Sequence, residues 1–355
     1  MQRLELKHAG GATSIRLAPD LLDQPGAWND VVRATTLIVT DRTVATLHLD
    51  RLRSSLKAHA PEVLVLEPGE TAKTAQTWLR ILETLAAIGA QRDATVVALG
   101  GGVIGDLAGF AAASYMRGIR VVQVPTTLLA QVDAAVGGKT GFNLEAGKNL
   151  VGAFHQPHAV MVDVGALETL ESRDFIAGMA EVIKYGAIRD AEFLAWLEAN
   201  VDGLLDRRPE PLQEAVRRSI AHKIALVEAD EREAGQRALL NFGHTFGHAL
   251  ETCTGYIRYR HGEAVAIGMH LAGRLSAGKG WIENNDAERL SRLIAAFGLP
   301  LDRPTEIDPE TLIERMRLDK KNLAGRFRLI VLEALGRARV RDDIEPQDLL
   351  ETLNS

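Results

Sequence analysis

The sequence predicts a two-domain protein, in which an α/β domain over residues 1–170 is followed by an all-α domain over residues 171–355. At 355 residues the chain is long for a single hydrophobic core, so two domains are expected. Up to about Thr169, short runs rich in β-branched residues alternate with helical patterns, and beyond it long amphipathic patterns replace the strand signal. Such alternation predicts a parallel sheet with helices on both faces.

Each element of this prediction rests on a short stretch of the sequence. Strands are predicted at Ala34–Thr40, Glu62–Leu66, Ala94–Leu99, Val121–Val124 and Ala159–Val162. Helices are predicted at Thr74–Ile88, Leu107–Met116, Asp174–Ile188, Pro211–Ala229 and Asp286–Phe297. The apolar stretch Leu107–Met116 is a buried helix in this prediction, because a membrane span needs about 20 residues.

Composition indicates an ordinary globular protein that acts on small molecules. Hydrophobic residues make up 46% and charged residues 25%, and the net charge is -6 with scattered lysines and arginines. This excludes the basic footprint of a nucleic-acid-binding protein and a polybasic membrane patch. Cys253 is the only cysteine, which excludes an internal disulfide. Charges directly after Met1 replace the apolar core of a signal peptide, so we expect a cytoplasmic protein.

A glycine-rich turn follows the third predicted strand. Gly100, Gly102 and Gly105 satisfy the G-x-G-x-x-G pattern between a strand and a helix. Glycines there let the backbone and the helix N-terminus approach a pyrophosphate. The usual carboxylate about 20 residues downstream is missing, and carboxylates for the ribose hydroxyls lie upstream, at Asp41 and Glu70. Many glycine runs of this kind only form a tight turn, so dinucleotide binding and a simple turn both stay open as interpretations.

Two further glycine-rich stretches, Asp133–Asn143 and Gly147–Gly152, are predicted to be flexible loops that each present a lysine. Lys139 and Lys148 suit an anionic ligand. The Gly-Gly-Lys-Thr sequence lacks the first glycine of a Walker A motif, which excludes ATP hydrolysis by that motif. Solvated lysines are the alternative, and the neighbouring nucleotide and metal patterns favour capture of a phosphate or carboxylate.

One carboxylate and three imidazoles form the most informative pattern of the sequence: Glu181, His244, His248 and His261. The first two histidines are four residues apart, one turn and therefore one face of a helix. Zinc held by two histidines and a carboxylate keeps its fourth position for water or substrate, as catalytic sites do. Three of these four residues are enough to bind the metal. The alternative is that the histidine pair is a coincidence of surface or core-edge residues, which is the commoner case for two histidines at this spacing.

The polar residues before the histidine pair extend this pattern. Arg237, Asn241, His244 and His248 fall at i, i+4, i+7 and i+11, which predicts one continuous helical stripe of hydrogen-bonding groups. If the helix begins after Arg237, that residue lies outside the stripe.

Ordered motifs from about Asp41 to Gly336 resemble the 3-dehydroquinate synthase family. They are Pro68-Gly69-Glu70-x-x-Lys73, Gly100–Asp106, Pro125-Thr126-Thr127, Asp133–Gly141, Gly147-Lys148-Asn149, Gly178-x-Ala180-Glu181-x-x-Lys184-Tyr185-Gly186, Asn241–Glu251, His261-Gly262-Glu263 and Asp319-Lys320-Lys321. The resemblance implies a Rossmann-like NAD-binding α/β domain, an all-α metal-binding domain, an active site in the cleft between them, and a homodimer.

The resemblance also implies roles for individual residues. Glu181, His244 and His261 would bind Zn²⁺ or Co²⁺, and His248 would contact the substrate. The implied phosphate-binding residues are Lys139, Asn149, Asn241 and either Lys320 or Lys321, with Arg117 from the partner subunit. Lys223 and Arg237 would hold the substrate carboxylate, beside Asp133 and Lys184. The residues implicated in NAD binding are Glu70, Lys73, Gly102, Val103, Ile104, Gly105, Asp106, Thr126, Thr127, Lys148 and Thr169, and we add Asp41 and Lys139.

The implied activity is that of a phosphorus-oxygen lyase of the shikimate pathway, in aromatic amino acid biosynthesis. It converts 3-deoxy-D-arabino-heptulosonate 7-phosphate to 3-dehydroquinate and phosphate by transient NAD-dependent oxidation, β-elimination, re-reduction and aldol cyclisation. A competing activity is that of another sugar-phosphate cyclase such as 2-deoxy-scyllo-inosose synthase; without a substrate carboxylate, however, Lys223 and Arg237 would be poorly compensated. Two functions of a different kind also compete, a metal-dependent NAD polyol dehydrogenase and a catalytically silent metabolite-binding protein.

Overall fold

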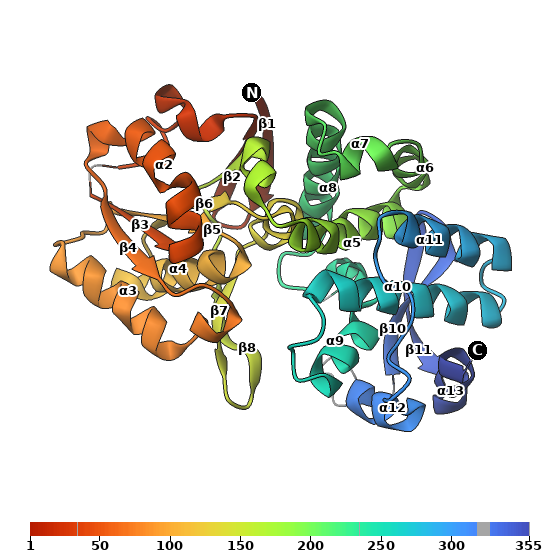
Figure 1. The fold of residues 1–355 in the computed structure, drawn as a ribbon. Coiled ribbons are helices and arrows are strands. Elements are labelled where there is room, and N and C mark those ends of the chain that lie inside the picture. Colours follow the sequence, from red (N-terminus) through yellow and green to blue (C-terminus); the bar gives the residue numbers. More distant parts are fainter. Residues whose placement is uncertain (34, 234, 318–326, 355) are drawn as a thin grey trace. The chain divides into compact units, whose positions relative to one another are not determined.

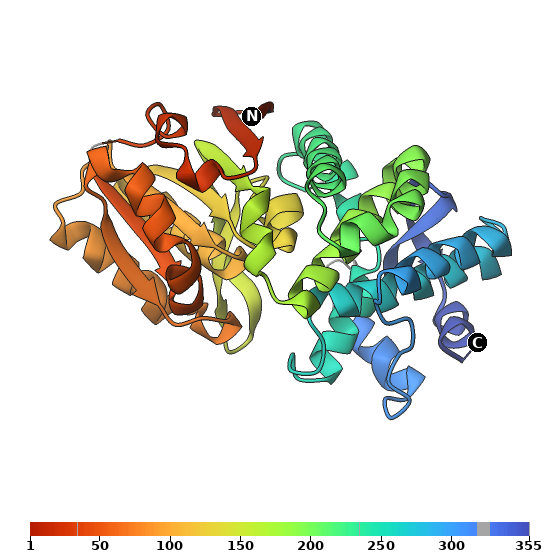
Figure 2. The same ribbon diagram turned by 45° about the horizontal axis from the view of Figure 1, so that its top comes forward.

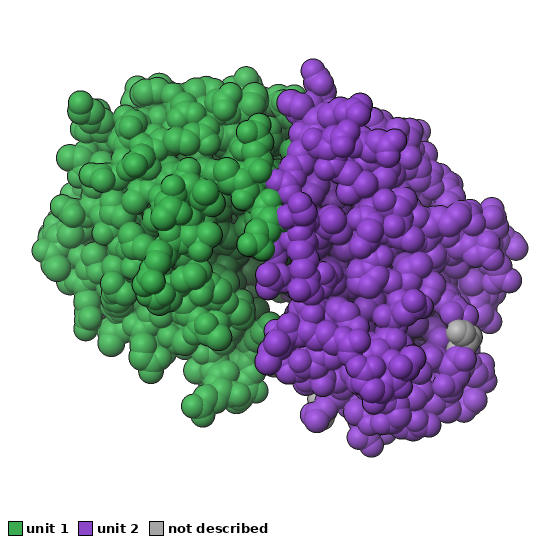
Figure 3. Space-filling view, viewed as in Figure 1, with its two compact units in different colours: residues 1–171, 212–232 green, residues 172–211, 233–355 purple. Residues whose placement is uncertain are grey.

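A computed structural model describes residues 1–355 except 34, 234, 318–326 and 355. The chain divides into two compact units, which are coloured separately in Figure 3. Unit 1 comprises residues 1–171 and 212–232, and unit 2 comprises residues 172–211 and 233–355.

Unit 1 is built on a seven-stranded sheet in the order β1-β2-β9-β6-β5-β3-β4 (Figure 1). Its strands are β1 (Gln2–His8), β2 (Gly11–Ala18), β3 (Thr36–Asp41), β4 (Glu62–Leu66), β5 (Thr95–Gly100), β6 (Arg120–Pro125) and β9 (Ala159–Asp163). β1 pairs antiparallel with β2, and the other neighbouring pairs are parallel. The five strands predicted from the sequence are confirmed, whereas β1 and β2 were not predicted.

Helices cover both faces of this sheet, as the alternating pattern predicted. Successive side chains of a strand point to opposite faces, and on β3 the residues Leu37 and Val39 join one core cluster while Ile38 joins another. The first cluster contains α3 (Ala75–Ala87) and α4 (Gly102–Ser114). The second contains Trp28 and α2 (Asp50–Ser55). α8 (Pro209–Ala229) belongs to unit 1 from residue 212 onward, and α1 (Arg42–Val44) follows β3.

The strand order reverses at β3. From β3 the chain proceeds to β4 on one side, and then returns to β5 on the other side. In open α/β sheets, ligands bind outside the carboxyl ends of the strands at such a switch point. Asp41 ends β3, and the turn Gly100–Gly102 follows β5, so both candidate nucleotide contacts lie at this edge.

The two stretches predicted to be flexible loops form instead an antiparallel hairpin of β7 (Lys139–Leu144) and β8 (Gly147–Phe154). Gly141 and Gly152 face each other in register, and a Cβ on either would come within 2.3 or 2.0 Å of the partner strand's backbone oxygen. These glycines serve close strand approach, which is why the flexible-loop prediction was wrong.

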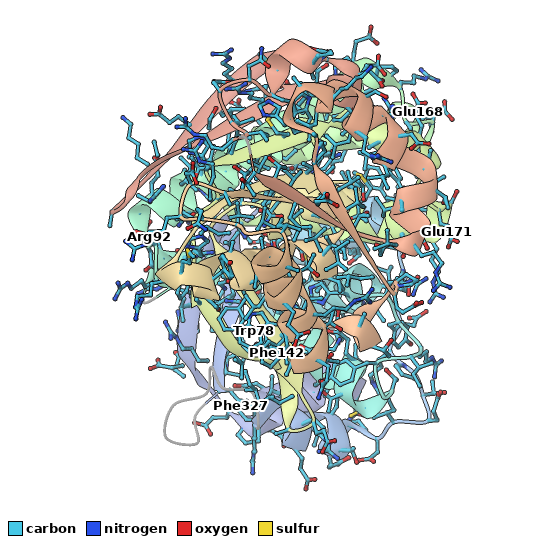
Figure 4. All side chains as sticks on the ribbon, turned by 90° about the vertical axis from the view of Figure 1, so that its left-hand side faces the viewer. Trp78, Arg92, Phe142, Glu168, Glu171 and Phe327 are labelled. Carbon is cyan, nitrogen blue, oxygen red and sulfur yellow. The ribbon has the colours of Figure 1, made fainter. Side chains whose placement is uncertain are left out.

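An aromatic cluster anchors this hairpin to the helices of unit 1. Phe142 of β7 lies 5.9 Å from Trp78 of α3 and 5.7 Å from Phe110 of α4, measured between ring centroids. Figure 4 labels Trp78 and Phe142, which lie beside each other. Such aromatic contacts add to the burial of the rings, so the hairpin and its lysines have a fixed position within unit 1.

Unit 2 is mainly helical (Figure 2). Its helices are α5 (Ser172–Arg189), α6 (Ala191–Ala199), α7 (Val201–Leu205), α9 (His244–Cys253), α10 (His261–Gly278), α11 (Asn284–Ala296), α12 (Pro309–Arg317) and α13 (Pro346–Asn354). They include the helices predicted near Asp174–Ile188 and Asp286–Phe297. The unit also contains a strand pair that was not predicted, β10 (Phe327–Ala334) and β11 (Arg337–Ile344). Among the described residues, no helix is long and apolar enough to cross a membrane.

Candidate metal centre and nucleotide-binding edge

Three helices of unit 2 each supply one residue of the candidate metal centre. Glu181 lies in the middle of α5, His244 is the first residue of α9, and His261 is the first residue of α10. α10 approaches α5 so closely that a Cβ on Gly262 would lie 1.8 Å from the backbone oxygen of Ala177. This glycine therefore lets His261 reach a position beside Glu181.

The helix that carries the histidine pair begins later than the stripe prediction required. Arg237 and Asn241 lie on a separate 3-10 helix, Gln236–Asn241, and Gly243 with φ 79° separates it from α9. A left-handed residue ends helical geometry, and glycine adopts it without a Cβ penalty. The continuous stripe from Arg237 to His248 was therefore wrong, although His244 and His248 do share one face of α9.

One oxygen of the buried Glu181 carboxylate is directed at the two histidines. Glu181 is fully buried, and Lys184 donates a hydrogen bond to its Oε2. Its Oε1 has no hydrogen-bond partner and lies 3.5 Å from Nε2 of His244 and 3.8 Å from Nε2 of His261. Leaving a buried carboxylate oxygen unsatisfied is unfavourable, so this atom is poised to bind a cation.

These three groups fit a divalent metal ion. Ligand atoms of a tetrahedral zinc site lie about 3.4 Å apart when each is about 2.1 Å from the ion, close to the distances from Glu181 Oε1 to the two imidazole nitrogens. The ligand atoms of Glu181, His244 and His261 all lie within 4.8 Å of one another. Three protein ligands leave a coordination position for water or substrate. A second group within the same distance comprises His248, Glu251 and His261.

The other ring nitrogen of each candidate ligand histidine has its own partner. Nδ1 of His244 lies 3.1 Å from the backbone oxygen of Phe242, and Nδ1 of His261 lies 3.2 Å from Oε2 of Glu251. Burial disfavours the protonated His261 ring, but the Glu251 hydrogen bond and the charges of Glu251 and Glu181 outweigh burial and raise its pKa. Both rings thus turn Nε2 toward Glu181.

His248 lies beside the two ligand rings. Its ring centroid is 5.4 Å from that of His244 and 5.9 Å from that of His261. No role was predicted from the sequence for Glu251, which is 5% exposed and lies seven residues after His244. That spacing is two helical turns and places both residues on one face, a signal that could have identified it.

In unit 1 a buried lysine links several residues of the predicted NAD set. Lys73 Nζ lies 2.5 Å from Oδ2 of Asp106 on α4 and 2.6 Å from Oδ1 of Asn149 on β8. Burial raises the pKa of Asp106, and the Lys73 charge opposes this rise. The predicted phosphate-binding Asn149 is therefore next to the residues predicted to bind NAD.

Most of the remaining predicted NAD contacts follow the carboxyl ends of the parallel strands, and one, Lys148, lies in the hairpin. Asp41 Oδ1 accepts a hydrogen bond from Val44 N and so caps α1, and Glu70 accepts one from Asn143. Four residues of the glycine motif, Gly102, Val103, Ile104 and Gly105, form the first turn of α4 with Asp106 directly after them. Thr126 and Thr127 follow β6 directly, Thr169 lies after β9 and is hydrogen-bonded to His48, and Lys148 lies in β8.

The predicted substrate-binding residues are divided between the units. In unit 1, Lys223 Nζ lies 2.5 Å from Oδ1 of Asp133, Lys139 is exposed at the start of β7, and Arg117 follows α4. In unit 2, Arg237 is 1% exposed and Asn241 donates a hydrogen bond to Glu233. Lys320 and Lys321 lie outside the described residues. Glu233 also had no predicted role.

Comparison with known proteins supports one family along most of the chain. The model for the N-terminal part of 3-dehydroquinate synthase matches residues 63–177, and the model for its C-terminal part matches residues 178–322. The chain belongs to the 3-dehydroquinate synthase family. A 3-dehydroquinate synthase of Halorhodospira halophila is 50% identical over 96% of this chain and 95% of the relative. One of Pseudomonas putida is 48% identical over 100% and 98%.

Solved structures of other cyclases share the fold of this family member. The 2-epi-5-epi-valiolone synthase from Streptomyces hygroscopicus, with NAD+ and Zn2+ bound, superimposes with a TM-score of 0.89 at 30% identity, covering 96% of both chains. A 2-deoxy-scyllo-inosose synthase complexed with carbaglucose-6-phosphate, NAD+ and Co2+ gives 0.88 at 26% identity, covering 99% of both. An iron-containing alcohol dehydrogenase of Thermotoga maritima, 15% identical, has a TM-score of 0.68 and covers 97% and 98% of the two chains; it shares the fold alone.

Proposed function

We propose that this protein is a 3-dehydroquinate synthase, which converts 3-deoxy-D-arabino-heptulosonate 7-phosphate to 3-dehydroquinate and phosphate. The observation that carries the proposal is the match at 48–50% identity over nearly the whole chain to relatives of that name. The identity to the two solved cyclases of other specificity is 30% and 26%, so those activities are not favoured.

The proposed cofactors are NAD and one divalent metal ion, Zn²⁺ or Co²⁺. Glu181, His244 and His261 would hold the metal, and the edge at β3, β5 and β6 would hold NAD. When bound, NAD accepts and returns a hydride, and the metal acts as a Lewis acid toward substrate oxygens. The orphaned Oε1 of Glu181 and the switch point beside β3 support these assignments.

The protein's own side chains would orient a substrate that is anionic at both ends. We assign the carboxylate to Lys223 and Arg237, which are 5% and 1% exposed, because cations in dry surroundings bind anions most strongly. The proposed phosphate-binding residues are Lys139, Asn149, Asn241, Arg117 and either Lys320 or Lys321. Asp133 and Lys184 would line the same pocket, and His248 would contact the molecule held at the metal.

Fixed cations explain how the chain would favour loss of phosphate. Holding the two ends of the substrate selects the conformer in which phosphate can leave and the ring can close. The cationic groups also stabilise negative charge where it develops. The proposed site thus needs few residues that react themselves, and many that position and compensate charge.

We further propose a cytoplasmic homodimer, with an NAD-binding domain over residues 1–170 and a metal-binding domain over residues 171–355. The compact units differ from these bounds mainly in one segment, because residues 212–232, which include most of α8, belong to unit 1. In this assembly Arg117 would act in the partner's site. The outward side chains Leu150 and Phe154 of β8, which are 38% and 49% exposed, are apolar and support burial against another chain. Mixing two inactive variants, Arg117→Ala and Lys223→Ala, tests the assignment of Arg117, because mixed dimers should regain activity in one of their two sites.

The activity itself is tested with metal-loaded protein, the heptulosonate phosphate and catalytic NAD. We expect phosphate and 3-dehydroquinate in equal amounts, without accumulation of NADH. NADH without phosphate would instead establish a dehydrogenase. No reaction with this substrate, but turnover of glucose 6-phosphate, would establish a cyclase of the other specificity.

A further inference from the structure

Glu251 is a carboxylate that the proposed reaction does not use, although it lies against the metal centre. It belongs to α9 and is 5% exposed. A buried carboxylate is unfavourable unless it accepts hydrogen bonds. Its Oε2 lies 3.2 Å from Nδ1 of His261, within hydrogen-bond distance.

This contact determines which nitrogen of His261 faces the metal position. An ionised carboxylate only accepts hydrogen bonds, so the contact places a proton on Nδ1 of His261. In the neutral ring the lone pair is then on Nε2, which lies 3.8 Å from the orphaned Oε1 of Glu181. The ring is therefore held in the tautomer that a metal ion at Glu181 requires.

The same helix supplies a metal ligand and this carboxylate. His244 and Glu251 are seven residues apart on α9, which places them on one face two turns apart. His261 begins α10, which packs against α9. The first ligand histidine differs, because its Nδ1 faces the backbone oxygen of Phe242 instead of a side chain. A side-chain substitution cannot remove the backbone partner of His244, but it can remove the carboxylate partner of His261. The role of the partner can therefore be tested at His261.

The alternative role for Glu251 is as a ligand of a second ion, since its group with His248 and His261 has metal-ligand spacing. A second ion there would need both nitrogens of His261, which would become an imidazolate between two cations. Two divalent ions joined by one imidazolate would repel each other strongly. One ion with a hydrogen-bonded histidine satisfies the same contacts.

We propose that Glu251 is a positioning residue for the metal site: it fixes the tautomer and orientation of His261 and makes that imidazole a stronger ligand. Carboxylates that accept from a ligand histidine have this effect in other metal sites, and their loss weakens metal affinity about 10- to 100-fold. The inference rests on the proposed metal centre, with Glu181, His244 and His261 as ligands.

The test is the zinc affinity of purified full-length protein, measured by competition with a chromophoric chelator. We expect Glu251→Ala to weaken zinc binding about 10- to 100-fold. Glu251→Gln keeps an acceptor oxygen without the charge, so it should lose less. Glu198→Gln is the matched control, because Glu198 of the same unit pairs with Arg289 and should leave the zinc affinity unchanged. Thermal unfolding of the metal-free proteins verifies that each variant is folded.

A spectroscopic readout separates positioning from a general structural role. In the Co²⁺-substituted protein, Glu251→Gln should shift the visible absorption bands, because a less basic imidazole changes the ligand field, whereas Glu198→Gln should not. Zinc affinity of Glu251→Ala within twofold of wild type would overturn the inference and leave the metal centre intact. Two zinc ions per wild-type chain would make Glu251 a ligand and overturn it as well. Wild-type protein that binds no zinc would overturn both the inference and the metal centre.

Discussion

Each unit contains a buried lysine that is paired with a carboxylate, and the two pairs differ in whether a buried carboxylate oxygen lacks a hydrogen-bond partner. In unit 1, Lys73 donates hydrogen bonds to the partly buried Asp106 and to Asn149, so the lysine links these two side chains. In unit 2, Lys184 holds one oxygen of Glu181, and the other oxygen has no hydrogen-bond partner. The unsatisfied oxygen faces two histidines.

This difference shows why an ion pair by itself does not reveal its role. Buried pairs of this kind add little net stability, because desolvation offsets much of their attraction. In unit 1, Lys73 donates to both Asp106 of α4 and Asn149 of β8, so it connects α4 with β8 next to the sheet edge that is proposed to bind NAD. The pair of unit 2 leaves a negative atom to be satisfied by a cation. We therefore expect substitutions at the pair of unit 2 to change zinc binding, and substitutions at the pair of unit 1 to leave it unchanged.

The largest effect should come from removing a metal ligand. His244→Ala should abolish zinc binding and turnover together, because two ligands do not retain the ion, while the NAD affinity set by unit 1 should stay within about twofold. Zinc content after dialysis, phosphate release and NAD titration give the three readouts. Stoichiometric zinc with full activity would remove His244 from the ligand set and break the contrast between the units.

A smaller loss of zinc affinity should follow from pushing α10 away from α5 without changing any of the three proposed ligands. Gly262→Ala places a methyl group against the backbone of Ala177, which should destabilise the protein by about 3 kcal/mol, at the upper end of overpacking effects, and weaken zinc binding. Urea unfolding and chelator competition measure the two effects. Gly278→Ala, at the end of the same helix with nothing within 4 Å, is the control and should be neutral or stabilising.

Breaking the pair of unit 1 should have a moderate effect that does not reach the metal. Lys73→Met leaves Asp106 partly buried beside no cation, and we expect a loss of about 2 kcal/mol in the free energy of unfolding, below the range for fully buried pairs because Asp106 is 22% exposed. The double variant with Asp106→Asn should recover part of it. Zinc affinity should stay unchanged; a matching loss of zinc would show that the two pairs are not independent.

The smallest effect should come from a partly exposed pair of α8, Glu214 and Arg217. The Arg217 hydrogen bond lowers the pKa of Glu214 to about 2. A folded-state pKa below the unfolded value stabilises the protein above pH 4.5, and this contribution is lost as pH falls toward 2. At 30% exposure the contribution is about 1 kcal/mol at most. The difference in unfolding free energy between wild type and Glu214→Gln should therefore shrink between pH 7 and pH 3; an increase would contradict this sign.

Short apolar runs predicted the central sheet well, because strands buried on both faces, such as β5 and β9, have largely hydrophobic sequences. β1 and β2 escaped prediction, since charged residues such as Arg3, Glu5 and Lys7 alternate along β1 at the sheet edge. The hairpin β7-β8 escaped it for a different reason. Its glycines allow close contact between strands, and a sequence does not distinguish that use of glycine from flexibility.

The metal-ligand candidates were predictable because two histidines one helical turn apart, with a carboxylate and a third histidine elsewhere in the sequence, match the donor set of an open zinc site. The histidine pair by itself would not have been enough. The features of the site that the sequence did not predict depend on backbone geometry. The left-handed Gly243 separates Arg237 and Asn241 from α9. The pattern of side chains does not indicate that the helix is interrupted there. No role was predicted for Glu251, because its helical spacing from His244 does not by itself show that it contacts His261, ten residues further along the chain.

In the proposed metal centre, Oε1 of Glu181 and the two imidazoles of His244 and His261 hold one divalent metal ion. Anomalous diffraction at the zinc edge, from crystals of the zinc-loaded protein, would locate this ion. We expect a single peak about 2.0–2.2 Å from Glu181 Oε1 and from Nε2 of His244 and His261. A peak bound instead by His248 and Glu251, or no peak near Glu181, would contradict this assignment.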